Sequence, residues 1–134
     1  MSQSIADELR AHIDAIEATY EFMLAYAAQG RVEEEAGRAG ARIREALTRC
    51  NAALERLPSL LQTLLEAKRL DPIEPYHAFV EIVERDALHS QTAIQLVLAQ
   101  RAISSQLIDN LNAWMHLRAL LTDLFVIDEI LKGQ

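Results

Sequence analysis

The residues most able to do chemistry gather in the stretch YHAFVEIVERDALH, residues 76–89. His77 and Glu81 are four residues apart, and on a helix this spacing puts two metal-binding side chains on adjacent turns. Asp86 and His89 are three apart, which suits a metal ion or a general base oriented by a carboxylate. Each pair supplies only two groups, so neither makes a site unless another helix adds to it.

The spacing of the charged residues in this stretch favours a solvated helix face over a site. Four of them form a ladder at intervals of four: His77, Glu81, Arg85 and His89. At about 100° per residue they fall opposite the apolar side of residues 76–98, so they point away from the core. The other histidines, His12 and His116, belong to no ExxH or HxxxH pair. We therefore expect no metal site and no cofactor, and interpret the ladder as surface pairing between helical turns.

A second pattern with chemical potential is a stripe of arginines. It comprises Arg31, Arg38, Arg42, Arg49 and Arg56, which fall within about 40° of one another on a helical wheel. One interpretation is pairing with the preceding helix, where Asp14, Glu17 and Glu21 form an acidic strip. The alternative is an anion site, because a guanidinium binds carboxylate or phosphate through two parallel hydrogen bonds. Within the stripe, the candidate anion-binding residues are Arg38, Arg42 and Arg49.

Composition restricts the class of protein. Residues 1–134 are the size of a single domain, and 51% of them are hydrophobic, with 4 Gly and 3 Pro, so we expect one folded core. The 20 acidic residues outnumber the 13 lysines and arginines, for a net charge of -7, which disfavours nucleic acid and anionic membranes as partners. No apolar run approaches the roughly 20 residues that cross a bilayer, and the first residues show no signal-peptide pattern. With Cys50 as the single cysteine, we expect a cytoplasmic protein without disulfides.

Apolar periodicity predicts a first helix at about 4–28 and a second at about 32–69, with a turn at Gly30. In the second helix, apolar residues alternate at intervals of four and three: Val32, Ala36, Ala39, Ile43, Ala46, Cys50, Ala53 and Leu57. This is a heptad seam, and its alanines allow the first helix to approach closely. Cys50 lies within the seam, where a thiol is expected to be a small buried hydrophobe. Pro58 predicts a kink in this second helix.

The remaining residues predict two further helices. The motif DPIE, which begins at Asp71, resembles a capping box with proline at the first helical position, so we expect a third helix at about 72–102. A turn near Ser104 or Ser105, either of which can cap a helix, gives a fourth helix at about 104–132. Short turns make neighbouring helices antiparallel. The predicted fold is therefore all-α, a four-helix up-down antiparallel bundle.

The fourth helix is apolar over a wider arc than one core contact needs. Its large apolar residues are Leu117, Leu120, Leu121, Leu124, Phe125, Ile127 and Leu131, and Trp114, Val126 and Ile130 add further area. Either this helix is central in the bundle, or it presents a second apolar face to another copy or to a partner. We favour a homodimer, with an interface that includes Trp114, Leu117, Leu121, Leu124 and Phe125.

Two stretches resemble the all-helical chorismate mutases. LRAHIDAIE, residues 9–17, is similar to the opening helix of that family, and LDPIEPYHAFVEIVERDALHSQ, residues 70–91, is similar to its last helix. The resemblance implies that Arg10 takes the place of an arginine that binds a substrate carboxylate, and that Arg38 takes that of a basic residue late in the first helix. Ala27 stands where the family has a second arginine.

Taken together, these patterns favour a non-enzymatic function. The sequence contains no nucleophile elbow, phosphate loop, paired metal motif or cysteine cluster. We therefore expect a helical interaction protein, such as an adaptor, chaperone, inhibitor or regulator, that acts through an apolar helix face as a homodimer or with a protein partner. The alternative is an enzyme or sensor for a small anionic ligand that uses Arg10, Arg38, Arg42 and Arg49.

Overall fold

Five α-helices make up the described part of the chain, which is residues 2–30 and 38–133 of a computed structural model. They are α1 (Ser2–Ala28), α2 (Arg38–Lys68), α3 (Glu74–Leu98), α4 (Ser105–Trp114) and α5 (Leu117–Lys132). No strand occurs in these residues, so the expected all-α class is confirmed. None of the described helices is long and apolar enough to cross a membrane.

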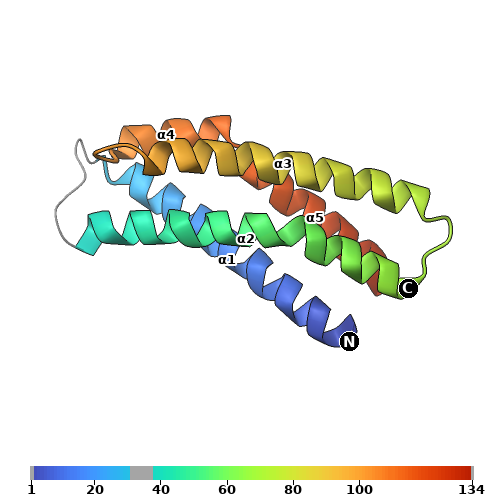
Figure 1. The fold of residues 1–134 in the computed structure, drawn as a ribbon. Helices are drawn as coiled ribbons and strands as arrows, with labels where there is room; N and C mark the ends of the chain where they lie inside the picture. The colour runs from blue at the N-terminus through green and yellow to red at the C-terminus, as the bar shows by residue number, and fades with distance from the viewer. Residues whose placement is uncertain (1, 31–37, 134) are drawn as a thin grey trace.

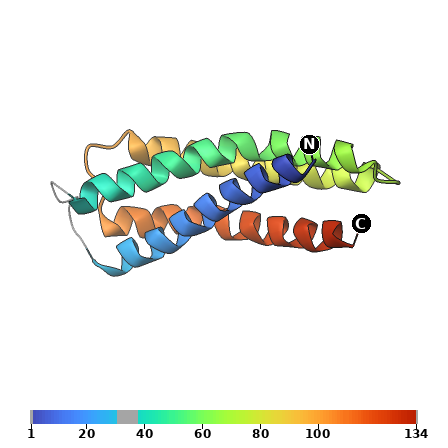
Figure 2. The same cartoon turned by 90° about the horizontal axis from the view of Figure 1, so that it is seen from below.

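The first three helices run alternately in opposite directions, and α4 followed by α5 returns along α3 (Figures 1 and 2). α2 contacts both α1 and α3, while α1 also contacts α4 and α5. Buried apolar residues from all five helices meet in one core, because each helix keeps its apolar stripe on one side. α1 begins and α5 ends at the same end of the molecule, opposite the loop between α3 and α4 (Figure 2).

The contact between α1 and α2 follows the predicted heptad seam. The buried seam residues are Ile43, Cys50, Ala53 and Leu57. The hydroxyl of Thr19 in α1 donates to the carbonyl of Ala15 in its own helix at 2.8 Å, and the same oxygen lies 3.3 Å from the carbonyl of Ala46 in α2. A side chain of α1 can come this near to the backbone of α2 only where the α2 residue is small, as Ala46 is. The predicted close approach of the two helices is therefore confirmed at Ala46. Val32 and Ala36, the first two seam positions, lie outside the described residues.

The turn after α1 forms at the predicted glycine. α1 ends at Ala28, and Gly30 has a φ of 67°, the left-handed conformation that closes many helices and that glycine adopts without strain. The expected start of the second helix at residue 32 lies outside the described residues. α2 continues through Pro58 as a single helix, and the kink expected at this proline stays a prediction.

α3 begins later than expected. Its first residue is Glu74, Ile73 occupies the N-cap position without a side-chain bond, and Pro75 lies in the first turn. A proline is tolerated there because the backbone N–H that it lacks has no partner within the helix. The predicted start at residue 72, capped by Asp71, is therefore wrong by two residues.

α3 ends at Leu98 rather than at residue 102. Arg44 of α2 binds the backbone at this end. Its guanidinium donates hydrogen bonds to the carbonyls of Leu98, Gln100 and Arg101 at 3.2, 2.9 and 3.2 Å. These bonds satisfy carbonyls that a helix end leaves without intrahelical partners. The next helix starts where the sequence predicted, because the Ser104 side chain accepts a hydrogen bond from the backbone N–H of Leu107 at 3.0 Å.

The expected fourth helix, 104–132, is two helices separated at Met115, which is extended with a ψ of 144°. The buried residues are Ser105, Ile108 and Leu111 in α4, and Leu117, Leu120, Leu121, Leu124, Ile127 and Leu131 in α5. On one uninterrupted helix these two sets would face directions roughly 150° apart. The break turns both apolar stripes toward the core, which a continuous helix could not do.

Candidate functional site

Acidic and aromatic side chains from neighbouring helices meet where α3 approaches the break between α4 and α5. Asp86 and His89 come from α3, Trp114 ends α4, His116 lies in the break, and Asp123 comes from α5. The His89 ring stacks on that of Trp114, with centroids 4.0 Å apart and an interplanar angle of 16°. The same ring meets that of His116 edge-on at 4.5 Å. We call these five residues the acid–histidine cluster.

Asp123 is the most perturbed acid of this cluster. Burial raises its pKa, and the hydrogen bond and negative charge of Asp86 raise it further, to about 6. Both causes act in the same direction, since burial penalises the charged form and a nearby carboxylate repels a second charge. The Oδ2 atom of Asp123 and the Nδ1 atom of His89 are buried without a hydrogen bond to any described residue. Below about pH 6 the carboxyl group of Asp123 is therefore mostly protonated.

The cluster can bind and release a proton at Asp123. In residues 2–30 and 38–133, no three His, Cys, Asp or Glu side chains are placed to hold a metal ion together. Ser90 follows His89 in the chain, but its side chain is fully buried. It lies about 100° around α3 from the histidine, so it faces the core. The arrangement does not present this hydroxyl as a nucleophile beside the imidazole.

The ladder of residues 76–89 is divided by the structure. Its first three members, His77, Glu81 and Arg85, are exposed, as expected of a solvated face. The expectation that His89 also points away from neighbouring helices is wrong, because it packs against Trp114. Asp86 likewise meets Asp123 of α5. α5 therefore adds a further group to the Asp86–His89 pair, and the sequence alone did not indicate this.

His116 and Asp123 are the members of the cluster that the sequence did not reveal. Neither belongs to a motif, and their partners on α3 are distant in the chain. A signal was nevertheless present, because the apolar stripe changes phase between Leu111 and Leu117. That change predicts a helix break close to His116, and a break exposes polar groups to a neighbouring helix.

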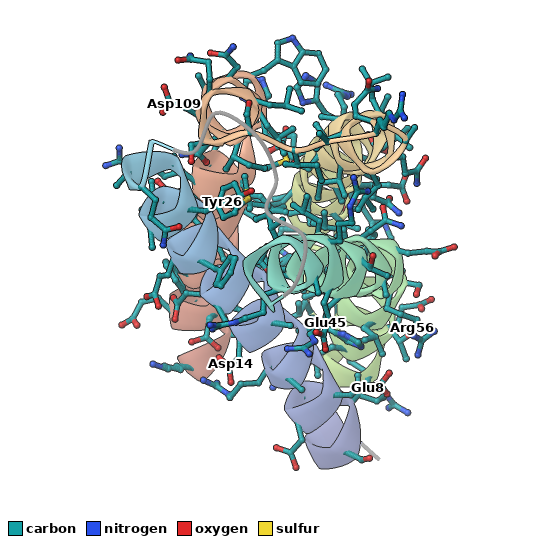
Figure 3. The ribbon with its side chains drawn as sticks, turned by 90° about the vertical axis from the view of Figure 1, so that its left-hand side faces the viewer. Glu8, Asp14, Tyr26, Glu45, Arg56 and Asp109 are labelled. Atoms are coloured by element: carbon teal, nitrogen blue, oxygen red, sulfur yellow. The ribbon has the colours of Figure 1, made fainter. Side chains whose placement is uncertain are left out.

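The arginines of the predicted stripe have separate partners. Arg42 lies over the ring of Phe22 at 5.2 Å, and Arg49 pairs with Glu45 at 3.6 Å. Arg56 pairs with Glu8 at 2.8 Å, and Figure 3 labels these two residues. The hydrogen bond from Arg56 holds the pKa of Glu8 below its ordinary value. Arg31 and the side chain of Arg38 lie outside the described part of the chain. Arg56 thus pairs with α1, but its partner is Glu8 and not a member of the expected acidic strip of Asp14, Glu17 and Glu21. Arg49 pairs within α2.

Arg10 lies apart from this stripe. Its guanidinium is 3.5 Å from the carboxylate of Asp128 in α5. Arg42 contacts Phe22, which lies about 18 Å further along α1 than residue 10 at the rise of an α-helix. The structure therefore does not bring Arg10 and Arg42, two of the candidate anion-binding arginines, to one anion. Arg38 is the second residue that the resemblance to chorismate mutases implies, and its side chain lies outside the described residues, so that implication stays a prediction.

Three of the five expected interface residues lie in the core. Leu117, Leu121 and Leu124 are 0%, 5% and 1% exposed, whereas Trp114 and Phe125 are 56% and 51% exposed. These three leucines were expected at an interface because α4 and α5, whose apolar stripes differ in phase, were treated as one helix with a wide apolar arc. Apolar surface does remain on α5 at Val126 and Ile130, which are also exposed.

No family model matches the chain, and comparisons with curated proteins and with solved structures found no match. What the protein does must therefore follow from the arrangement of its own side chains.

Proposed function

We propose that the chain is a non-enzymatic helical interaction protein that forms a homodimer through one apolar surface. We define this α3–α5 surface by five exposed residues: Ile82 and Leu96 of α3, Trp114 of α4, and Val126 and Ile130 of α5. Their exposure is the observation that carries the proposal. Large apolar side chains that gather on the outside of a folded domain commonly mark an interaction site.

Helical geometry places the two α3 residues on the side that meets α4 and α5. Ile82 lies one turn before Asp86, which contacts Asp123 of α5. Leu96 lies two turns after His89, which stacks on Trp114. Residues separated by four or seven positions share one side of a helix, so both apolar side chains flank the acid–histidine cluster.

The same geometry applies to α5. Val126 and Ile130 lie three and seven residues after Asp123, and therefore on the same side of the helix as that carboxyl group. Because α3 and α5 run in opposite directions (Figure 1), this C-terminal half of α5 lies level with the N-terminal half of α3, where Ile82 is. The exposed apolar residues of the two helices are thus neighbours across one seam.

A second copy of the chain can cover this surface by two-fold symmetry, since the same patch then serves both partners. Burying a large aliphatic or aromatic side chain completely is worth about 1.5–3 kcal/mol relative to leaving it exposed. Below about pH 6, protonation of Asp123 removes a negative charge near the middle of the surface. Few charges at the centre are typical of protein interfaces.

Two finer aspects of the fold and setting belong to the same proposal. We infer that α4 and α5 together act as the fourth member of an up-down four-helix bundle, because the pair returns along α3. The buried free thiol of Cys50 supports a reducing compartment such as the cytoplasm. The alternative of a small-anion enzyme or sensor has less support, because Arg10, Arg42 and Arg49 each have a separate partner.

Light scattering tests the dimer. The wild-type chain should have the mass of a dimer at micromolar concentration, and Ile130→Glu should be monomeric with an unchanged helical CD signal, because a carboxylate in an apolar interface is unfavourable. Leu24→Glu is the matched control, since it makes the same kind of change at an exposed position of α1 and should stay dimeric. A monomeric wild-type chain, or equal dissociation of both variants, would contradict the proposal.

A further inference from the structure

A groove lies between α1 and α5 at the end of the molecule where α1 begins and α5 ends. Figure 2 shows these two helices diverging toward that end. The groove has a volume of about 280 Å³, and most of its lining is apolar. Its apolar lining includes Leu9 and Ile13 of α1, Leu61 and Leu64 of α2, and Leu124 and Ile127 of α5.

The groove is large enough for a small organic molecule. Ligand pockets in proteins commonly measure about 300–1,000 Å³, and a dry apolar cavity of about 150 Å³ accommodates benzene. A volume of about 280 Å³ therefore fits an aromatic ring with a short aliphatic chain. Leucine and isoleucine walls favour such a ligand through dispersion contacts and the removal of apolar surface from water.

Charge at the mouth of the groove selects the kind of molecule. Arg10, Asp14, Glu17 and Asp128 all line the groove, which sets three carboxylates against one guanidinium. Asp128 already has two cationic neighbours, Arg10 at 3.5 Å and Lys132 at 3.6 Å. Asp14 and Glu17 form no ion pair within the described ranges. Asp14 is labelled in Figure 3. The groove therefore offers two carboxylates that lack an ion pair.

We propose that this groove binds a small amphiphilic cation, with its apolar, ring-bearing body between α1 and α5 and its protonated amine beside Asp14 and Glu17. These acids are three residues apart on α1, so they are neighbours on one helix face and repel each other. An ammonium group relieves that repulsion, whereas a carboxylate head group adds to it. Arg10 does not reverse this preference, because Asp128 already holds it.

The site goes beyond the proposed dimer. On α5 the lining of the groove includes Leu124 and Asp128, and a helical wheel places both about 160° from Val126. A ligand in the groove is therefore separate from the α3–α5 surface, so the loss of one would not imply the loss of the other.

Three probes with one tail and different head groups test the site: 4-phenylbutylamine, 4-phenyl-1-butanol and 4-phenylbutyrate. Each is titrated into the full wild-type chain while amide and methyl NMR shifts are followed. We expect saturable shifts at Leu9, Ile13 and Leu64, and affinity falling from amine to alcohol to carboxylate, by about tenfold or more between the first and last. Equal or tighter binding of the carboxylate overturns the cationic preference, and the lack of saturable shifts at these residues with millimolar amine overturns the site.

A pair of charge variants separates a local effect from the negative charge of the whole protein. Asp14→Asn with Glu17→Gln keeps the shape of both side chains, and should weaken amine binding about fivefold while leaving alcohol binding unchanged. Glu21→Gln with Asp109→Asn removes the same number of charges at exposed positions that do not line the groove, and should leave the order of the probes intact. An equal loss of selectivity in both variants overturns the assignment of Asp14 and Glu17.

Filling the groove gives an independent readout. Ala6 lines it, so the ring introduced by Ala6→Phe should abolish the shifts produced by all three probes while the helical CD signal is retained. Binding that survives in a folded Ala6→Phe variant overturns the location of the site. The two charge variants decide the proposal even where Ala6→Phe does not fold, because their changes are confined to polar atoms near the surface.

Discussion

The two ends of the molecule are held together by different kinds of interaction. At the end where α1 stops, the Tyr26 hydroxyl donates a hydrogen bond to the carbonyl of Ile103 at 2.6 Å. The Ser105 hydroxyl in turn donates to the carbonyl of Tyr26, also at 2.6 Å. All three residues are buried, so we call this the closed end.

At the opposite end, where α1 begins, the polar contacts are ion pairs on the surface. Arg10 pairs with Asp128, and Arg56 pairs with Glu8 (Figure 3). Removing one partner of a buried hydrogen bond costs about 1–3 kcal/mol, whereas an exposed ion pair contributes about 0–1 kcal/mol. Helix α1 is therefore fixed firmly at one end and lightly at the other. The groove between α1 and α5 lies at this open end.

The largest effect is expected from breaking the closed end. Tyr26→Phe should lower the free energy of unfolding by about 1–3 kcal/mol, because the buried carbonyl of Ile103 loses this donor. Urea unfolding followed by CD measures the change. Tyr20→Phe is the control, as it removes the same atom from a half-buried ring in the same helix, and should cost less than about 0.5 kcal/mol. Equal costs for the two variants would show that the closed end has no special role.

An intermediate effect is expected at Asp123, between the two ends. Its replacement should raise the free energy of unfolding rather than lower it. A pKa of about 6 for Asp123, against about 3.9 in an unfolded chain, means that the folded chain binds more protons between these values. The stability that Asp123 contributes is present below about pH 4 and is lost as the pH rises to about 6. Asp123→Asn should therefore raise the stability at pH 7, by about 1 kcal/mol after allowance for solvent screening.

Unfolding free energies measured from pH 4 to pH 7 test this prediction. The difference between wild type and Asp123→Asn should grow across that range and then level off. Taking the difference removes the titration of groups that behave alike in both proteins. A variant that is less stable at pH 7, or a difference that does not change with pH, would contradict the prediction.

The smallest effect is expected at the open end. Arg10→Gln removes the exposed pair with Asp128 and should change the unfolding free energy by less than about 0.5 kcal/mol. The same urea experiment measures it, and added salt should shrink the difference further. A loss comparable to that of Tyr26→Phe would mean that both ends are held equally firmly, and the contrast between them would disappear.

Local signals in the sequence were sufficient for much of the fold. The turn at Gly30 and the cap at Ser104 were predicted because each depends on the conformational or hydrogen-bonding preference of one residue. The α1–α2 seam was predicted because a heptad pattern requires only regular helices. The start of α3 was placed too early, since both Pro72 and Pro75 suit a first helical turn and their local sequence does not choose between them.

The acid–histidine cluster could not be assembled in the same way. It depends on the register of α5 against α3, and that register depends on the break at Met115. No glycine or proline lies near this break, so only the changed phase of the apolar stripe indicated it. The same break accounts for Leu117 and Leu121, which were expected at an interface and belong to the core.

Cys50 has a consequence for measuring motion in this molecule. Burial raises the pKa of its thiol to about 12, so in the folded state the sulfur is protonated and beyond the reach of alkylating reagents. It lies in the seam between α1 and α2, and the chain has 1 cysteine. The rate of thiol labelling therefore reports how often α1 lifts away from α2. The protein carries its own reporter of local opening, with no added probe.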